Sequence, residues 1–486
     1  MELFGRRQIF TTTEKITADN VIAELNAALS VHVANMMEME YLYWYRRGTQ
    51  PILNREKVVR KEINNKITEN HASEIVAFKN GYFLTQPAFY ISRKEDKDVT
   101  DRVKRLNEYL YLSGKQQVDN KVADWFHTVG IGVVYVEPYP DEAIPVRAYA
   151  LDPRSAFVVY SRNPGHEPVM GVNVVVTGKN ENTSQAVFDV YTRDTVFRIS
   201  GGITGRLITD SPVIATATDV IGAEDNRIGE IPIIEYQYDS NRMGAFETVI
   251  PLLDSINNVQ SNRIDGIEQF IQSLMVFYNC QLGDDKQGNP ITPAYIREAG
   301  AIFLKSIGQD KADLKILSEQ LDQTQTQVLV DYLYQQVLTI CGMPSTTKGG
   351  TSTSDTGAAV LYRDGWYQAD TVARNTEDLF KESNRRFDAV FIKILNQKTD
   401  LNVVLSDFEL KFVRNETANI LVKTQAAMNL KELGFSPELA FAKSGLSNDP
   451  VADVANSQKY IEEKWSVSDK SDKEDVYAAL DGNELI

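Results

Sequence analysis

Two segments of this sequence have the composition of nucleotide-binding loops, but neither has the spacing that such binding requires. Gly130–Gly132 is a shortened dinucleotide fingerprint. Its third glycine is missing, and a strand-like segment follows where a helix is needed. Lys348–Thr351 reads Lys-Gly-Gly-Thr, whereas a Walker loop places Gly, four residues and then Gly-Lys-Ser/Thr. Neither segment therefore predicts nucleotide binding.

Side chains that bind metals or act as nucleophiles are few. No His-Glu-x-x-His, Cys-x-x-Cys or Gly-x-Ser-x-Gly pattern occurs. Asp284 and Asp285 lack the alternating oxygen ligands and closing glutamate of a calcium loop. We therefore predict no catalytic residue, no metal site and no cofactor; a metal-dependent hydrolase with a dispersed carboxylate site is the alternative. The histidines and cysteines are His32, His71, His127, His166, Cys280 and Cys341.

The composition is that of a folded but strongly acidic chain. Its 486 residues correspond to about three domains. A hydrophobic share of 43% and a charged share of 24% exclude wholesale disorder. A net charge of −16 makes non-specific binding to nucleic acid or to anionic membranes unfavourable. The two cysteines indicate a reducing compartment. No apolar run reaches the roughly 18 residues of a membrane span, and we expect assembly in the cytoplasm.

The first half of the chain changes from helical to strand-like periodicity. Apolar spacing predicts helices over 17–47, 54–83 and 99–127. From 130 to 235 the period becomes two, and Gly201-Gly202 indicates a hairpin turn. No helices interleave, so the region is predicted to be mostly antiparallel rather than Rossmann-like. The expected strands are 132–137, 169–177, 186–192, 195–200, 203–209 and 231–236.

The second half is dominated by long helices. A helix is predicted over 245–278, with Pro251 tolerated only in its first turn. A compact insertion over 281–318 holds a strand at 301–304. A further helix follows over 319–341, and then the Ser/Thr/Gly-rich stretch 345–357. The elements expected beyond it are a helix over 358–397, strands over 401–404 and 408–413, and helices over 417–433, 436–444 and 450–464, ahead of an acidic tail.

The two helical arms, 245–278 and 319–341, can run antiparallel with the insertion at their far end. Neither arm has enough partners within one chain to cover both of its faces. Repetition of identical subunits around an axis supplies the missing partners. We therefore expect a closed ring, with the Ser/Thr/Gly-rich stretch projecting toward its opening.

Several stretches, in this order, resemble one known family. They are Tyr43–Gly48 with Pro51-Ile52, Asn64–Ile67 with Asn70, Gly81–Leu84, Gly130–Glu137, Leu151–Arg154, Ile231–Tyr236, Leu252–Asn257 and Ser261-Asn262. The sequence resembles the portal proteins of tailed double-stranded DNA bacteriophages, in the branch of long-tailed phages of Gram-positive hosts. It departs from the pattern at Tyr238–Ser240, where paired asparagines are common, and in the abundance of Thr and Ser in the loop.

The resemblance implies an α+β portal fold in a cyclic oligomer, usually a dodecamer. It comprises a mixed α/β wing, a helical stem, a small α/β clip, a long helix and an α-helical crown. The implied parts are 1–244 wing, 245–280 stem, 281–318 clip, 319–341 stem, 342–357 tunnel loop, 358–414 long helix and strands of the wing, and 415–486 crown with its acidic tail.

The same resemblance implies the functional residues and partners of a DNA channel at the capsid portal vertex of the virion. The ring would bind double-stranded DNA, the terminase large subunit, head-completion adaptors, scaffold and major capsid protein, and no membrane. Lys348 would make weak phosphate contacts; the alternative is a solubilising loop residue. A non-portal structural scaffold remains the second alternative function. The implied tunnel-loop residues are Thr346, Thr347, Lys348, Gly349, Gly350, Thr351, Ser352 and Thr353. The implied clip docking surface is Asp284, Asp285, Lys286, Arg297 and Lys305.

Overall fold

A computed structural model describes most of the chain as helices, strands and ordered connections. The described residues are 5–58, 61–94, 96–141, 143–178, 185–206, 211–271, 274–278, 280–282, 304–306, 313–317, 323–345, 365–412, 420–447, 450–451, 453–458 and 460. The chain divides into two compact units. The first unit is Met1–Tyr43, Glu74–Glu247 and Tyr367–Ile486, and the second is Trp44–Ser73 and Thr248–Trp366.

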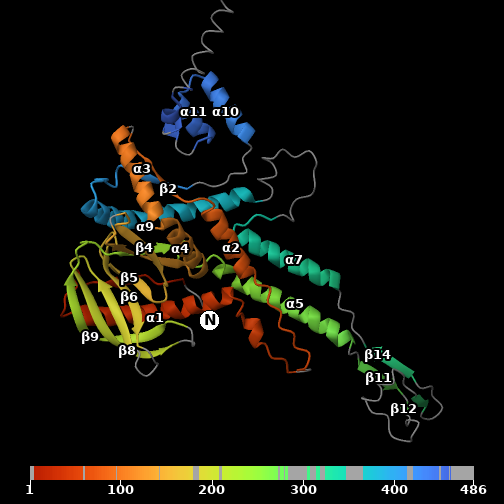
Figure 1. Ribbon diagram of the computed structural model, residues 1–486. Coiled ribbons are helices and arrows are strands. Elements are labelled where there is room, and N and C mark those ends of the chain that lie inside the picture. The colour runs from red at the N-terminus through yellow and green to blue at the C-terminus, as the bar shows by residue number, and fades with distance from the viewer. Residues whose placement is uncertain are drawn as a thin grey trace, which may run out of the picture. The chain divides into compact units, whose positions relative to one another are not determined.

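A six-stranded sheet is the largest β element of the first unit (Figure 1). Its strands follow the order β1-β5-β6-β7-β8-β9, and all neighbours are antiparallel except β1 and β5. The predicted, mostly antiparallel architecture of this region is therefore confirmed. The strands are β1 Ile9–Thr11, β5 Ala156–Ser161, β6 Pro168–Thr177, β7 Gln185–Tyr191, β8 Thr195–Arg206 and β9 Val213–Asp225.

One face of this sheet packs on helix α1 (Val21–Arg46). Leu25 and Ala28 of the helix share a buried cluster with Met170, Phe188 and Ile199 of the strands. Within strand β7 the buried residues Ala186, Phe188 and Val190 alternate with more exposed ones, as a half-buried strand requires. The predicted N-terminal helix is thus confirmed, with its first turn at Val21.

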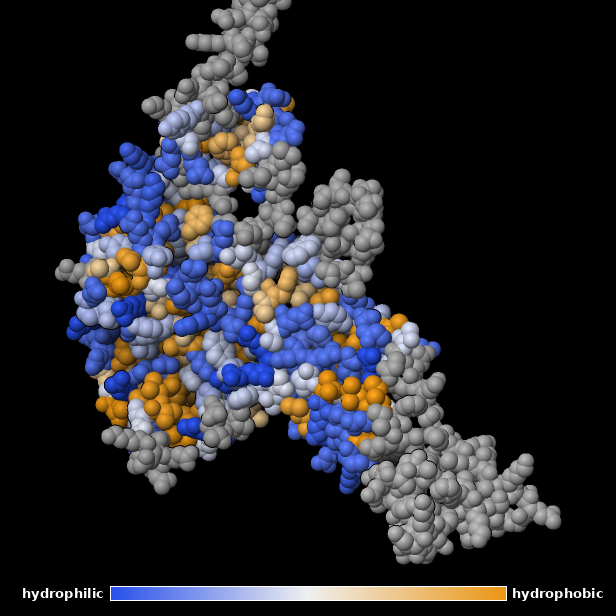
Figure 2. All heavy atoms as spheres, turned by 45° about the vertical axis from the view of Figure 1, so that its right-hand side comes forward, coloured by the Kyte–Doolittle hydropathy of each residue, from blue (hydrophilic) through white to orange (hydrophobic). Residues whose placement is uncertain are grey.

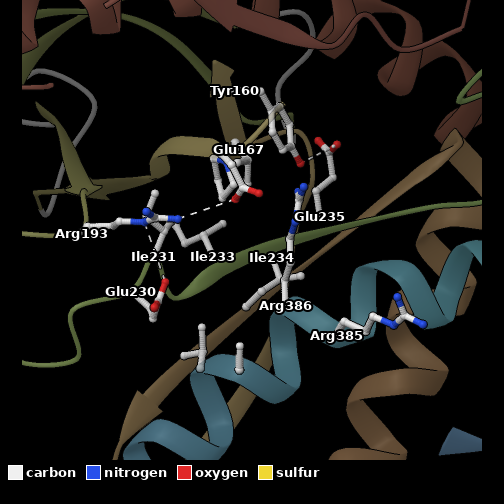
Figure 3. A pocket seen from close by; sticks show the side chains of 14 residues that line it. Tyr160, Glu167, Arg193, Glu230, Ile231, Ile233, Ile234, Glu235, Arg385 and Arg386 are labelled. Atoms are coloured by element: carbon white, nitrogen blue, oxygen red, sulfur yellow. Dashed lines mark hydrogen bonds and ion pairs between the residues drawn. The ribbon is translucent and has the colours of Figure 1, made fainter. Parts of the chain in front are cut away.

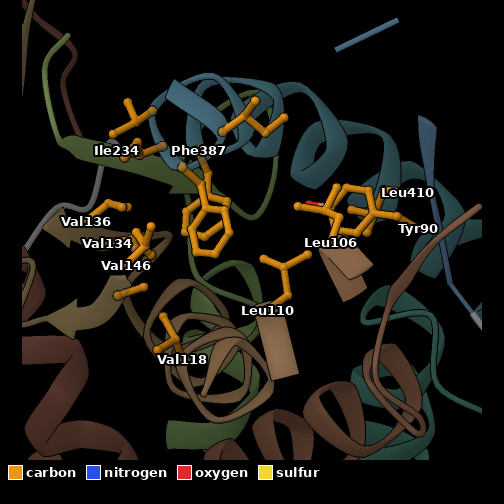
Figure 4. Close-up of a cluster of buried hydrophobic side chains, with 14 of the residues drawn as sticks. Tyr90, Leu106, Leu110, Val118, Val134, Val136, Val146, Ile234, Phe387 and Leu410 are labelled. Carbon is orange, nitrogen blue, oxygen red and sulfur yellow. The ribbon is translucent and has the colours of Figure 1, made fainter. Parts of the chain in front are cut away.

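A second core joins the three-stranded sheet β10-β3-β4 to helices α3, α4 and α9. Figure 4 shows Phe387 of α9 between Val134 of the sheet and Leu106 and Leu110 of α3. This cluster ties the long C-terminal helix to the middle of the chain. The elements are β3 Ile131–Pro138, β4 Val146–Leu151, β10 Ile233–Gln237, α3 Lys97–Leu112, α4 Lys115–Val129 and α9 Trp366–Lys398.

A buried polar network crosses the same core. The Asn384 amide donates to Tyr90 Oη (2.7 Å) and to Asp388 Oδ1 (3.0 Å). Tyr236 donates from Oη to Asn384 Oδ1 (3.1 Å), and Lys115 donates to the same oxygen (3.2 Å). Burial raises the pKa of Asp388 to about 7. Because each buried polar group needs a partner, this network fixes how α9 lies on α4.

The remaining elements are shorter or belong to the second unit. Strand β2 pairs with β15, and α10 packs on α11. In the second unit the helices are α5 and α7, with two antiparallel strand pairs, β11–β14 and β12–β13. Their bounds are η1 Pro51–Asn54, α2 His71–Phe83, β2 Phe89–Ser92, η3 Glu247–Val249, α5 Ile250–Ile271, β11 Leu274–Tyr278, β12 Cys280–Leu282, β13 Leu304–Ser306, β14 Asp313–Leu317, α7 Gln323–Ile340, β15 Phe408–Lys411, α10 Ile420–Glu432 and α11 Pro437–Ser444.

The helix expected over 54–83 is wrong in its first half. Only His71–Phe83 is helical, after a 3₁₀ turn over Pro51–Asn54. The backbone of 65–69 instead donates hydrogen bonds to side chains of α5. A helix cannot make those bonds, since its own carbonyls occupy the same donors. The predicted stretch 99–127 is likewise two helices, because Gly114 adopts a left-handed φ of 75°.

The helix expected over 245–278 ends earlier, at Ile271, and begins at Ile250 after a 3₁₀ turn. Pro251 lies in its first turn, as predicted. The apolar run Leu274–Tyr278 is a strand because it pairs with Asp313–Leu317. The strand expected over 401–404 is wrong, whereas 408–411 forms β15. Of the strand expected at 301–304, only Leu304 lies within the described residues, where it begins β13.

The hairpin turn expected at Gly201-Gly202 is wrong, because β8 continues through both glycines. Gly201 is required for another reason. A Cβ there would meet the Phe188 ring and lie 2.6 Å from the Thr216 carbonyl oxygen. The glycine therefore permits close approach of neighbouring strands rather than a turn.

Replacing Gly201 with Ala is expected to destabilise the first unit by about 1–3 kcal/mol, because the added methyl overpacks the sheet. The measurement is the apparent melting temperature, which should fall by several degrees. Gly202→Ala is the matched control, since nothing lies within 4 Å of a Cβ at that position. Equal melting temperatures for the two variants would contradict this account of Gly201.

Candidate functional site

Helices α5 and α7 form a pair in the second unit. Figure 1 shows them side by side, with the short strands beyond one end. The Arg263 guanidinium of α5 donates from Nη1 to Gln327 Oε1 of α7 (2.8 Å). The β11–β14 ladder continues directly from this pair, with Leu274 opposite Leu317 and Tyr278 opposite Asp313. The two helices and the ladder therefore form one continuous antiparallel arm.

Three polar side chains at every fourth position of α5 bind an extended segment, residues 61–70, which we call the strap. All three are buried, with exposed fractions of 0–4%. Each satisfies a strap N–H that has no partner in regular secondary structure. The bonds are Glu69 N–H to Asn257 Oδ1 (2.8 Å), Ile67 N–H to Ser261 Oγ (2.9 Å) and Asn65 N–H to Asp265 Oδ1 (2.7 Å).

The last of these positions, Asp265, also carries the charge of the site. Lys57 pairs with its Oδ2, and Arg55 Nη2 lies 3.3 Å from the same oxygen. Burial works against ionisation, but the Lys57 ammonium and the Asn65 donors outweigh it and lower the pKa of Asp265. The carboxylate therefore stays ionised and binds both Asn65 of the strap and the two cations that precede the strap.

The beginning of α5 is fixed by a second buried contact. Tyr45 is fully buried and donates from Oη to Asp254 Oδ1 (2.9 Å). Burial raises the pKa of Asp254, and the hydrogen bond from Tyr45 opposes that shift. Three residues before α5, Glu247 forms an ion pair with Arg6 (2.7 Å), which also pairs with Glu38 (2.9 Å). Buried polar contacts therefore lie both before and after Ile250, where the helix begins.

Helices α5 and α7 also carry exposed apolar side chains. Figure 2 shows hydrophobic surface in this region, near the distal end of α5. Side chains of this size are normally buried, so an exposed row of them marks an interaction surface. The exposed fractions are 39% for Ile264, 46% for Ile267, 64% for Val328, 46% for Leu329, 60% for Tyr332 and 54% for Ile340.

Most residues predicted to contact DNA or partners lie outside the described residues. These are the tunnel-loop residues 346–353 and the clip residues Asp284, Asp285, Lys286 and Arg297. Lys305 is described and lies in β13, opposite Gln281 of β12. On the near side of the loop, Ser345 is buried and donates from Oγ to Gln335 of α7.

Two features that would indicate other functions are absent from the described residues. Within those ranges, no group of three or more His, Cys, Asp or Glu side chains converges as a metal site would require. No helix in the described part of the chain combines the length and hydrophobicity needed to cross a bilayer.

The family profile described as phage portal protein, SPP1 Gp6-like, matches residues 25–466. The chain belongs to this family. Portal proteins are structural proteins that form the DNA-packaging channel at one vertex of a phage capsid, and the sequence-based prediction of that role is confirmed. No curated protein matches the chain.

The strap contacts of this portal protein were not predicted from its sequence. One signal in the sequence is that polar residues at 257, 261 and 265 interrupt the apolar spacing of the predicted helix. Asn64, Asn65 and Asn70 in the strap are poor helix formers. Together these two features indicate an extended segment lying on a polar helix face.

Replacing Asp265 with Asn is expected to destabilise the second unit by about 1–3 kcal/mol at pH 7, because two cations lose their partner. Since the folded pKa of Asp265 is lowered, its stabilisation is present above the unfolded pKa, near 4, and is lost as pH falls through the folded value. The melting temperature of the Asn variant should therefore approach that of the wild type as the pH is lowered from 7 to 3. Glu268→Gln, on the same helix, is the control. A constant difference across this range would contradict the assignment.

Proposed function

We propose that the second unit contains the stem and clip of the portal, and that the first unit contains its wing together with the crown at its C-terminal end. In this proposal α5 and α7 are the stem helices, and the segment between them is the clip. Residues 342–357 are the tunnel loop, and the helices from α10 onward are the crown. The exposed apolar surfaces of α5 and α7 are the observation that carries the proposal. A channel subunit needs such surfaces to bind its neighbours.

Ring formation follows from how the stem residues are divided between inside and outside. The polar side chains Asn257, Ser261 and Asp265 are already used by the strap of the same chain. Ile264, Ile267 and the α7 residues have no equivalent cover among the described residues of the second unit. A head-to-tail contact between identical copies covers them and closes into a ring, which we propose is a dodecamer.

The charge of the protein suits a channel through which DNA must slide. Strong phosphate contacts would hold the duplex, because each neutralised phosphate adds to affinity. The chain carries a net charge of −16, and the tunnel loop offers hydroxyls and a single cation, Lys348. A ring of Lys348 side chains makes weak, repeated contacts that permit movement.

The partners follow from the position of each part in such a ring. The clip, with Asp284, Asp285, Lys286, Arg297 and Lys305, binds the terminase large subunit and afterwards the head-completion adaptors. The wing contacts the scaffold and the major capsid protein. The ring is assembled in the host cytoplasm and retained in the virion at the portal vertex.

Replacing Tyr332 with Glu, together with Val328→Glu, is expected to weaken ring assembly. Each side chain contributes about 1.5–3 kcal/mol when fully buried, so the protein concentration for half-assembly should rise at least tenfold. Native mass spectrometry at a series of concentrations measures it. Tyr332→Phe keeps the apolar surface and should assemble normally. Unchanged assembly of the double Glu variant would refute the role of this surface.

Replacing Lys348 with Ala is expected to reduce the DNA retained per particle, because the constriction loses its cations. The length and amount of packaged DNA in particles carrying the variant provide the measurement. Lys348→Arg keeps the charge and should package normally. If packaging and retention are unchanged in the Ala variant, Lys348 is only a solubilising residue.

A further inference from the structure

A cavity of about 190 Å³ opens in the first unit between strand β5, strand β10 and helix α9. Figure 3 shows it from close by. Its floor is apolar and is formed by Val158, Ile231, Ile233, Ala389 and Val390. This volume accommodates one branched aliphatic or aromatic side chain from another segment.

The rim of this cavity carries three arginines and three glutamates. Arg193 lies 3.6 Å from Glu167 and 3.9 Å from Glu230, as the dashed lines in Figure 3 mark. Arg385 and Arg386 of α9 also line the cavity, and no carboxylate pairs with either of them among the described residues. The cavity is therefore an apolar cup beside two uncompensated guanidinium groups.

The other rim carboxylate, Glu235, does not neutralise these cations. It forms an ion pair with Arg242 and accepts a hydrogen bond from Tyr160 Oη (3.4 Å). Arg386 lies over the Tyr160 ring, 5.4 Å from its centroid, so its guanidinium is held at the rim. A ligand with a carboxylate next to an apolar side chain matches this arrangement.

Strand β9 of the same protein carries an exposed apolar side chain with carboxylates near it. It is the last strand of the six-stranded sheet, so one of its edges has no strand partner in the described structure. The register with β8 passes from Ile199 opposite Val220 to Arg198 opposite Gly222 and omits Ile221. Ile221 is therefore a bulge residue, and its side chain is 56% exposed.

Acidic residues flank this bulge. Asp219 and Glu224 are exposed, and neither side chain has an ion-pair partner among the described residues. The bulge distorts the strand edge and so disfavours pairing through the backbone. A contact through side chains, with Ile221 as the apolar anchor, is the interaction this edge can make.

One copy does not place its own anchor in its own cavity. The cavity is lined by β5, and β9 lies four strands away across the same sheet. At about 4.8 Å per strand this is a separation of about 19 Å. A surface and its complement at separate places on one subunit make a head-to-tail contact, which is the kind that closes rings.

We propose that Ile221 of one copy inserts into this cavity of the next copy, with Asp219 and Glu224 facing Arg385 and Arg386. The contact rests on the proposed ring and adds a specific wing interface to it. It joins neighbouring wings independently of the stem helices.

The test is a disulfide between copies. A chain with Ile221→Cys and Ala389→Cys, in which Cys280 and Cys341 are replaced by Ala, is oxidised with copper phenanthroline. Denaturing gels without reductant should show a ladder of covalent multimers, and each single-cysteine chain should remain monomeric on the gel. Rings of normal native mass without a ladder overturn this contact and leave the ring intact. Absence of rings for the wild-type chain overturns the proposed ring itself.

Reversing the charges on the two sides of the contact provides a second test. Arg385→Glu with Arg386→Glu should raise the concentration for half-assembly at least tenfold. Adding Asp219→Lys with Glu224→Lys should restore it. Assembly that is unaffected by the first pair, or not restored by the second, overturns the proposed pairing.

Discussion

The constraint on which the second unit depends is the hydrogen bonding of the strap backbone. A buried N–H must find an acceptor, and here the acceptors are side chains of α5 at positions 257, 261 and 265. The helix therefore buries polar side chains beside its apolar residues Leu253 and Ile256, while Ile264 and Ile267 near its end stay exposed. We propose that identical neighbours cover these exposed residues.

The first unit holds its long C-terminal helix by a different means. Helix α9 is anchored by apolar packing around Phe387 and by the network of Asn384, Asp388 and Tyr90. Such a network allows one register of the helix only, because a shift leaves several buried polar groups without partners.

Sequence periodicity predicted the parts of this fold that obey local rules. The N-terminal helix, the position of Pro251 and the antiparallel sheet follow from apolar spacing and from proline geometry. The strap and the strand β11 could not be predicted in this way, since distant partners decide their conformation. The role of Gly201 was predicted wrongly for the same reason. A glycine is required there because Phe188 and Thr216 on other strands leave no room for a Cβ. The functional loop and most of the clip remain sequence-based predictions.

We propose that the exposed apolar side chains of α5 and α7 are covered only by copies of the same chain arranged around a hollow. Electron microscopy of the purified protein tests it most directly. The account predicts closed rings with an open centre and uniform subunit number. Compact monomers at every concentration, or open fibres, would contradict it.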